Sequence, residues 1–213
     1  MSESARPALL LAVAGILLAA ASCAPRSADG TPPDAGGAEA VPAPVAGTMA
    51  WPGWGGPEGD FQVPDAGLGR SWPEGGPPAL WSRELGPGYS GVTVADGLLV
   101  TMYRDGGEEV TVALDAASGE PVWQRRDQAP TLESHVVQFG EGPNATPLRA
   151  GDTVVTLGYT GLLRALAAAT GDLRWSHDLL AEFDGEVLDF GTSASPVLWQ
   201  GRVIVLVGGA RQA

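Results

Sequence analysis

Short apolar runs separated by turn-forming residues recur through the second half of the chain. The runs at 92–95 and 98–103 flank Asp96-Gly97, a pair typical of a type I′ hairpin because both central residues need a positive φ. Residues 110–114 form a third run, and a turn sequence leads from it to a fourth around 122–123. The pattern predicts short antiparallel strands with local connections, four to a unit. A weak helical period over 176–182 is expected to be a loop or one helical turn.

The strand pattern repeats along the chain. Three segments start alike, from Tyr89, Asn144 and Ser193, and two continue alike, from Val110 and Leu162. The marker glycines are 54 and 50 residues apart and the marker tryptophans 42 and 52 apart, intervals typical of propeller blades. The markers are Gly97, Gly151 and Gly201, and Trp81, Trp123 and Trp175.

One repeat carries a motif of wider occurrence. Residues 113–123 read ALDAASGEPVW and match the pattern A-x-D-x-x-x-G-x-x-x-W, so this segment resembles the tryptophan-docking motif of pyrroloquinoline-quinone-type (PQQ-repeat) β-propellers. The match uses Ala113, Asp115, Gly119 and Trp123; the second copy keeps Ala165, Gly171 and Trp175 but has Ala167 in place of the Asp. The resemblance is strengthened by WPGWGGPEGD from Trp51, which is similar to the start of secreted bacterial members.

The resemblance implies an all-β fold, a partial β-propeller of four-stranded antiparallel blades. It also implies that the Trp of one blade packs flat on the turn of its neighbour and that the Asp ties that turn together. On this basis Trp123 and Trp175 are structural, and the second blade lacks a docking hydrogen bond because of Ala167.

The N-terminal segment is typical of an exported protein. Residues 9–21 are uninterruptedly apolar, but as a helix they rise only about 20 Å, short of the roughly 30 Å hydrocarbon core. We therefore predict a signal peptide over 1–22. The sequence Ala-Ala-Ser-Cys ending at Cys23 resembles the bacterial lipobox, which implies a lipid on Cys23 and a membrane anchor. The alternative is an ordinary signal peptide with an incidental Cys.

Three further segments follow. Residues 23–50 form a Pro/Gly/Ala-rich linker predicted to be disordered, because they offer almost nothing large and apolar to bury. Residues 51–88 place several aromatic residues among turn formers, and this approach segment either seals the following domain or forms a ligand groove. Residues 89–213 supply two blades and the start of a third, so we expect the chain to be a fragment or a truncated product. The aromatic residues are Trp51, Trp54, Phe61, Trp72 and Trp81.

The composition excludes several classes of function. With 25 acidic and 12 basic residues the net charge is −13, which disfavours nucleic acid as a partner. The single Cys excludes internal disulfides and the vicinal Cys pair of quinone-dependent alcohol dehydrogenases.

The segment 184–189, with Asp184, Glu186 and Asp189, is interpreted as a solvated acidic turn rather than a Ca²⁺ loop. Glu133-Ser134-His135 is discounted as a nucleophile and base, because adjacent strand residues point to opposite faces. No catalytic, cofactor-binding or metal-binding residue is predicted, and no cofactor.

The leading hypothesis is a non-catalytic propeller lipoprotein of the bacterial cell envelope. It would be anchored to the membrane by its N-terminal lipid, would face the periplasm or exterior, and would act as a protein-interaction scaffold. Signal and repeats together resemble the propeller lipoproteins of the outer-membrane assembly machinery. The alternatives are a fragment of a quinone-dependent dehydrogenase and a carbohydrate- or ligand-binding propeller.

Overall fold

A computed structural model describes residues 50–63, 71–131, 138, 140–186 and 189–208. All described residues belong to one compact unit, which lies within residues 43–213. The predictions for the signal peptide and Cys23, and for the linker up to residue 49, lie outside the described residues. Within those described ranges, no helix is long and apolar enough to cross a membrane.

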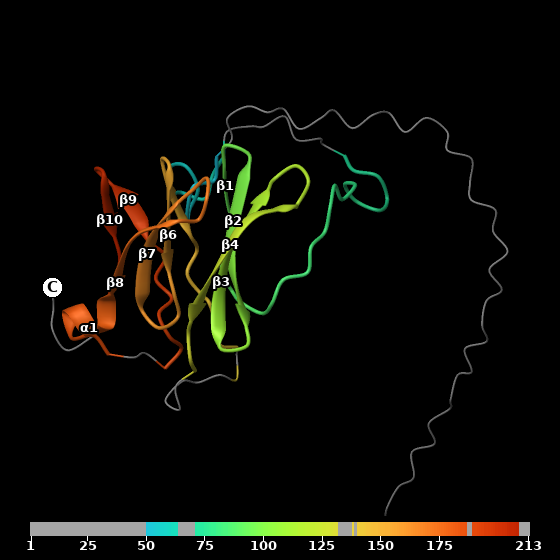
Figure 1. Ribbon diagram of the computed structural model, residues 1–213. Coiled ribbons are helices and arrows are strands. Elements are labelled where there is room, and N and C mark those ends of the chain that lie inside the picture. The colour runs from blue at the N-terminus through green and yellow to red at the C-terminus, as the bar shows by residue number, and fades with distance from the viewer. Residues whose placement is uncertain (1–49, 64–70, 132–137, 139, 187–188, 209–213) are drawn as a thin grey trace, which may run out of the picture. The chain divides into compact units, whose positions relative to one another are not determined.

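The described chain folds into two four-stranded antiparallel sheets and a two-stranded hairpin, which follow one another in chain order (Figure 1). In each sheet the strand order is the sequence order, as in a propeller blade. Blade 1 contains β1 (Thr93–Ala95), β2 (Leu98–Asp105), β3 (Glu108–Asp115) and β4 (Pro121–Gln128). Blade 2 contains β5 (Leu148–Ala150), β6 (Thr153–Leu157), β7 (Leu162–Ala167) and β8 (Leu173–Asp178). The third unit contains β9 (Val197–Trp199) and β10 (Arg202–Ile204).

The structure is therefore a partial all-β propeller, as the repeats predict. Asp96 and Gly97 both have positive φ, 52° and 73°, and close the first hairpin in the manner of a type I′ turn. Gln200 and Gly201, at 47° and 74°, do the same in the third unit. The single helix among the described residues, α1 (Leu179–Phe183), is a short turn after β8 that starts three residues later than the weak helical period.

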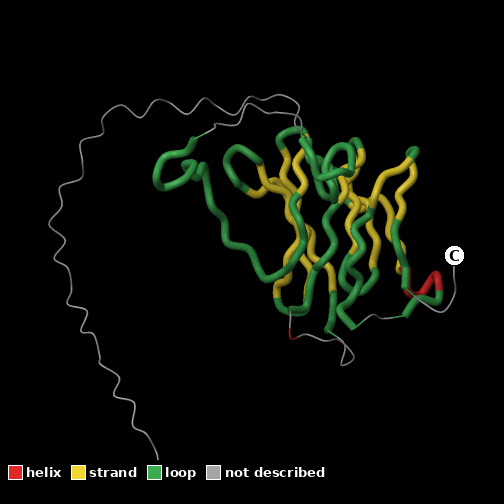
Figure 2. Tube along the Cα trace, turned by 180° about the vertical axis from the view of Figure 1, so that it is seen from behind, coloured by secondary structure: helices red, strands yellow, loops and turns green. Residues whose placement is uncertain are grey.

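Successive side chains of one strand enter different cores. Val154 of β6 packs with Val100 and Trp123 of blade 1, whereas Val155 packs in a second core that Val203 of the third unit borders. Because side chains alternate along a strand, this arrangement buries both faces of the middle sheet. The view in Figure 2 shows the sheets standing side by side with their strands roughly aligned. Each blade is thus held by its neighbours rather than by a core of its own.

The approach segment contacts both blades. Trp51 pairs with Val94 of β1 through two backbone hydrogen bonds of 2.7 and 3.0 Å, and the carbonyl of Pro52 accepts the N–H of Arg149 in β5 at 2.6 Å. These contacts fit a sealing role. The role does not extend to every aromatic residue of the segment, because Trp54, Phe61 and Trp72 all stay more than half exposed.

Candidate functional site

Trp123 connects the two complete blades. Its indole Nε1–H donates to the carbonyl of Ala168 at 2.8 Å, and its ring lies so close to Gly171 that a Cβ there would be 2.7 Å from the ring. In β3, Ala113 is the residue directly opposite Trp123, and it is completely buried. A glycine below the ring and an alanine beside it give the indole the space to lie flat between the sheets.

Trp81 makes the same contact one blade earlier. Its Nε1–H donates to the carbonyl of Ala116 at 3.1 Å, and a Cβ on Gly119 would be 2.5 Å from its ring. Arg83 adds a hydrogen bond of 3.0 Å to the carbonyl of Gly119. Trp81 lies in the predicted approach segment, and this contact was not predicted from the sequence. The signal was present in the 42-residue interval to Trp123.

A carboxylate organises the turn under Trp81. Asp115 Oδ1 accepts hydrogen bonds from the N–H of Ala117 at 3.1 Å and from the N–H and hydroxyl of Ser118, both at 2.8 Å. These bonds, those from Ser118 foremost, hold the pKa of Asp115 below its ordinary value of 3.8. The turn therefore presents its carbonyl to the indole from a fixed backbone.

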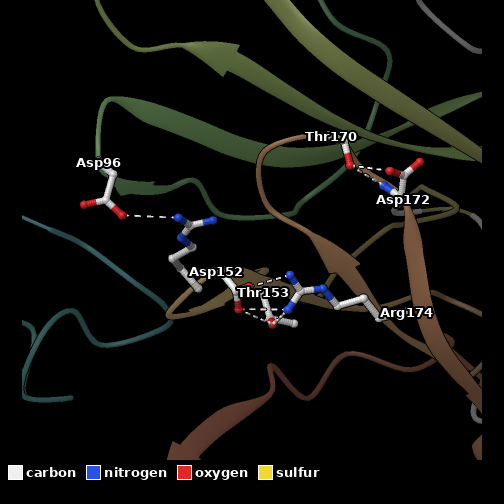
Figure 3. Close-up of polar contacts among 7 residues, drawn as sticks. Asp96, Asp152, Thr153, Thr170, Asp172 and Arg174 are labelled. Carbon is white, nitrogen blue, oxygen red and sulfur yellow. Dashed lines mark hydrogen bonds and ion pairs between the residues drawn. The ribbon is translucent and has the colours of Figure 1, made fainter.

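The corresponding turn of blade 2 is organised differently. The side chain of Ala167 offers no acceptor, and instead Thr170 Oγ1 donates to Asp172 Oδ2 at 2.6 Å and accepts the N–H of Asp172 at 3.3 Å. Figure 3 shows these bonds beside a second pair, in which Arg174 holds both carboxylate oxygens of Asp152 at 2.8 and 2.6 Å. The Arg174 hydrogen bonds lower the pKa of Asp152 to about 2. In blade 2, contacts of Thr170 and Asp172 within the turn therefore replace the carboxylate that Asp115 supplies in blade 1.

Trp175 occupies in blade 2 the place that Trp123 has in blade 1. It is paired with Ala165 across β7 and β8, as Trp123 is with Ala113. Its side chain is nevertheless 38% exposed, with the ring tilted at 5.5 Å from His177. Of the residues that the structure describes, the third unit contributes only β9, β10 and adjoining loops, and none forms a turn beneath this indole.

Charged side chains are buried where blades 1 and 2 meet. Glu109 Oε1 accepts the N–H of Tyr159 at 2.7 Å, so a carboxylate of β3 holds a loop of blade 2. Burial raises the pKa of Glu109 from 4.5 to about 7, against the lowering effects of the Tyr159 N–H and of the nearby Arg104 and Arg164. Asp127 faces the same group from β4 and pairs with Arg164 of β7 at 2.6 Å.

Arg104 lies at the other end of this cluster of buried charges. It is 3% exposed, donates to the carbonyls of Glu141 and Ala129, and has its Nε 2.9 Å from the Glu141 carboxylate. Its guanidinium also lies over the Tyr159 ring, 5.9 Å from the centroid. The cluster therefore fastens strand ends and loops of two blades, and its geometry is that of a structural network.

A cavity of about 270 Å³ lies beside α1 and is lined mainly by apolar atoms. Glu186 is its acidic residue, and it was one of the three carboxylates considered for Ca²⁺. Among the described residues, no group of three or more His, Cys, Asp or Glu side chains stands close enough to hold a metal ion. The described residues do not supply the carboxylate set of a Ca²⁺–quinone site. Glu133-Ser134-His135 lies outside the described residues.

Comparison with curated proteins gives no match. Among solved structures, the quinohemoprotein alcohol dehydrogenase of Comamonas testosteroni is similar at 22% identity and a TM-score of 0.44, over 59% of this chain and 18% of that one. BamB from Moraxella catarrhalis is similar at 23% identity and 0.35, over 57% and 30%. The quinohemoprotein alcohol dehydrogenase ADHIIG of Pseudomonas putida HK5 is similar at 25% identity and 0.41, over 58% and 18%.

The chain thus spans less than a third of the length of each of these structures. The similarity to the first two, at 22% and 23% identity, concerns the fold alone. The match to a protein-family model is more extensive, because it covers residues 74–211, from the approach segment through all three units. The chain belongs to the β-propeller family described as outer membrane protein assembly factor BamB.

Proposed function

We propose that the chain is part of a non-catalytic scaffold protein of the bacterial cell envelope, anchored by a lipid on Cys23, whose propeller binds protein partners in outer-membrane protein assembly. The observation that carries this proposal is the family match over residues 74–211. The lipobox-like sequence before Cys23 supports an envelope location.

Buried polar groups of the described blades bind to the protein itself, as expected of a scaffold. The indoles of Trp81 and Trp123, and the buried charges of Arg104 and Glu109, contact the protein's own backbone. On the third unit, in contrast, Trp199 is 58% exposed on a strand whose three side chains all reach the surface. Its exposure makes this position accessible to a cross-linking probe.

Site-specific photocross-linking in the native envelope tests the proposal. A photoreactive amino acid at Trp199 is expected to cross-link to a component of the outer-membrane assembly machinery, whereas the same probe at the exposed turn residue Glu120 serves as the matched control. Absence of any such product at Trp199 and at further exposed positions of the three units would contradict the scaffold function. Quinone- and Ca²⁺-dependent reduction of an artificial electron acceptor by the full-length protein would favour the dehydrogenase alternative instead.

Lipid attachment is tested separately. Growth with an alkyne-labelled fatty acid is expected to label the wild-type protein and not the Cys23→Ala variant. Equal labelling of the two proteins, or labelling of neither, would contradict the anchor.

A further inference from the structure

The approach segment holds a small closed loop between Gly53 and Phe61. The loop is tied by backbone hydrogen bonds from Gly56 to Gly53 at 3.1 Å, from Gly59 to Gly56 at 3.3 Å and from Phe61 to Gly55 at 2.8 Å. The loop displays two aromatic side chains, Trp54 and Phe61, which are each 58% exposed. Their ring centroids are 5.3 Å apart and their planes meet at 86°, so that the two rings form a right-angled apolar corner, here called the aromatic corner.

Two glycines of this loop are closely packed. A Cβ on Gly55 would be 2.9 Å from the Gly59 backbone, and one on Gly56 would be 2.8 Å from the Trp51 ring. Trp51 is itself bound to β1, so the loop stands on the blade. Phe61 has a φ of 60°, which is unfavourable for a bulky residue. Strained backbone of this kind is concentrated at functional sites, and here it presents a large apolar side chain to solvent.

The charge of the loop favours a cationic ligand. Residues 50–63 contain Glu58 and Asp60 and no basic side chain, in a protein of net charge −13. Asp60 Oδ1 accepts the N–H of Gln62 at 2.9 Å, which holds that carboxylate beside Phe61. The faces of aromatic rings attract cations, most strongly in the case of Trp, and the two acidic side chains of the same loop favour a cation over a neutral or anionic group.

We propose that the aromatic corner is a docking site for a basic segment of a partner protein, with an arginine or lysine side chain seated against Trp54 and Phe61 and its charge balanced by Glu58 and Asp60. This proposal rests on the proposed function only in taking the ligand to be part of a protein. The recognition itself needs nothing more than the cation.

The test uses the full chain and a fluorescein-labelled peptide of alternating Gly and Arg, with fluorescence anisotropy measured in about 150 mM salt, where surface charges more than about 8 Å apart are screened. Wild-type protein is expected to bind the peptide, and Trp54→Ala to weaken binding about fivefold, the effect of losing a cation–π contact at an exposed site. Phe61→Gly, which suits the positive φ, and Glu58→Gln are expected to weaken it by smaller factors. Trp72→Ala is the matched control, because Trp72 is exposed to a similar degree, 54%, and is expected to leave binding unchanged.

Two results would overturn the proposal. One is peptide binding by Trp54→Ala within twofold of wild type, which would reduce the interaction to the general acidity of the surface. The other is Trp54-dependent binding of a neutral cello-oligosaccharide with no such dependence for the peptide, which would make the corner a glycan site. If cross-linking fails at Trp199 and at the further exposed positions while the peptide still binds through Trp54, the scaffold function is contradicted and the cation site remains. If cross-linking at Trp199 succeeds and Trp54→Ala leaves peptide binding unchanged, only the cation site is contradicted.

Discussion

Replacement of Trp123 by alanine tests the contact between the two complete blades. The indole is 9% exposed, donates to Ala168 and rests on Gly171, so the truncation removes a hydrogen bond and leaves a cavity between two sheets. Replacement of a buried Trp by Ala lowers the free energy of unfolding by about 3–5 kcal/mol, and we expect a loss in that range for Trp123→Ala. Trp123→Phe keeps a ring over Gly171 and loses the donor, which corresponds to about 1 kcal/mol.

Trp175→Ala is the matched control for this prediction. Trp175 has the same position in the repeat but is 38% exposed, so its truncation is expected to cost about 1 kcal/mol or less. Urea unfolding followed by far-UV circular dichroism measures both losses without relying on the fluorescence of the residues that are changed. Equal losses for Trp123→Ala and Trp175→Ala would show that the indole does not act through the turn of the next blade.

Three further variants test other contacts. Because the pKa of Glu109 is raised in the folded state, that state binds the proton more tightly, and the free energy of unfolding is expected to fall by about 3 kcal/mol as pH rises from about 4.5 to about 7. Glu109→Gln is expected to remove this slope in urea titrations at several pH values; an unchanged slope would assign it to other groups. Gly119→Ala is expected to destabilise the protein by about 1–3 kcal/mol more than Gly97→Ala, since both have positive φ but only Gly119 lies under an indole. A lower thermal midpoint for Gly97→Ala would contradict this. Ala167→Asp is expected to raise the thermal midpoint by restoring the acceptor that Asp115 provides, and a lowered midpoint would show that the Thr170 contacts already fill that role.

The strand order could be predicted from the sequence because hairpin turns and repeat intervals are local signals. Asp96-Gly97 specifies a turn through its backbone requirement alone, whatever packs around it. Strand length was predicted less well. We expected strands over 98–103 and 110–114, whereas β2 extends to Asp105 and β3 begins at Glu108.

The residues that the predicted strands left out are the charged ends of β2 and β3. Arg104 and Glu109 belong to a sequence, RDGGEE, that is typical of a solvated turn. In the structure both are buried, because groups far along the chain, Glu141 and Tyr159, provide their partners. No local pattern carries that information. The interaction of Trp81 with Gly119 was also missed. The 42-residue interval to Trp123 marks Trp81 as part of the repeat, but its partner is fixed by the stacking of blades and not by neighbouring residues.

The alternation of Val154 and Val155 between two cores has a consequence for how the molecule opens. Each sheet depends only on the sheets next to it, so cooperativity should decay along the stack as in a one-dimensional array. Val203, Val205 and Val207 are only partly buried against the second core, and amide hydrogens of β9 and β10 should therefore exchange with solvent first. Protection should then be higher in β3 and β6, which contribute fully buried side chains to the cores.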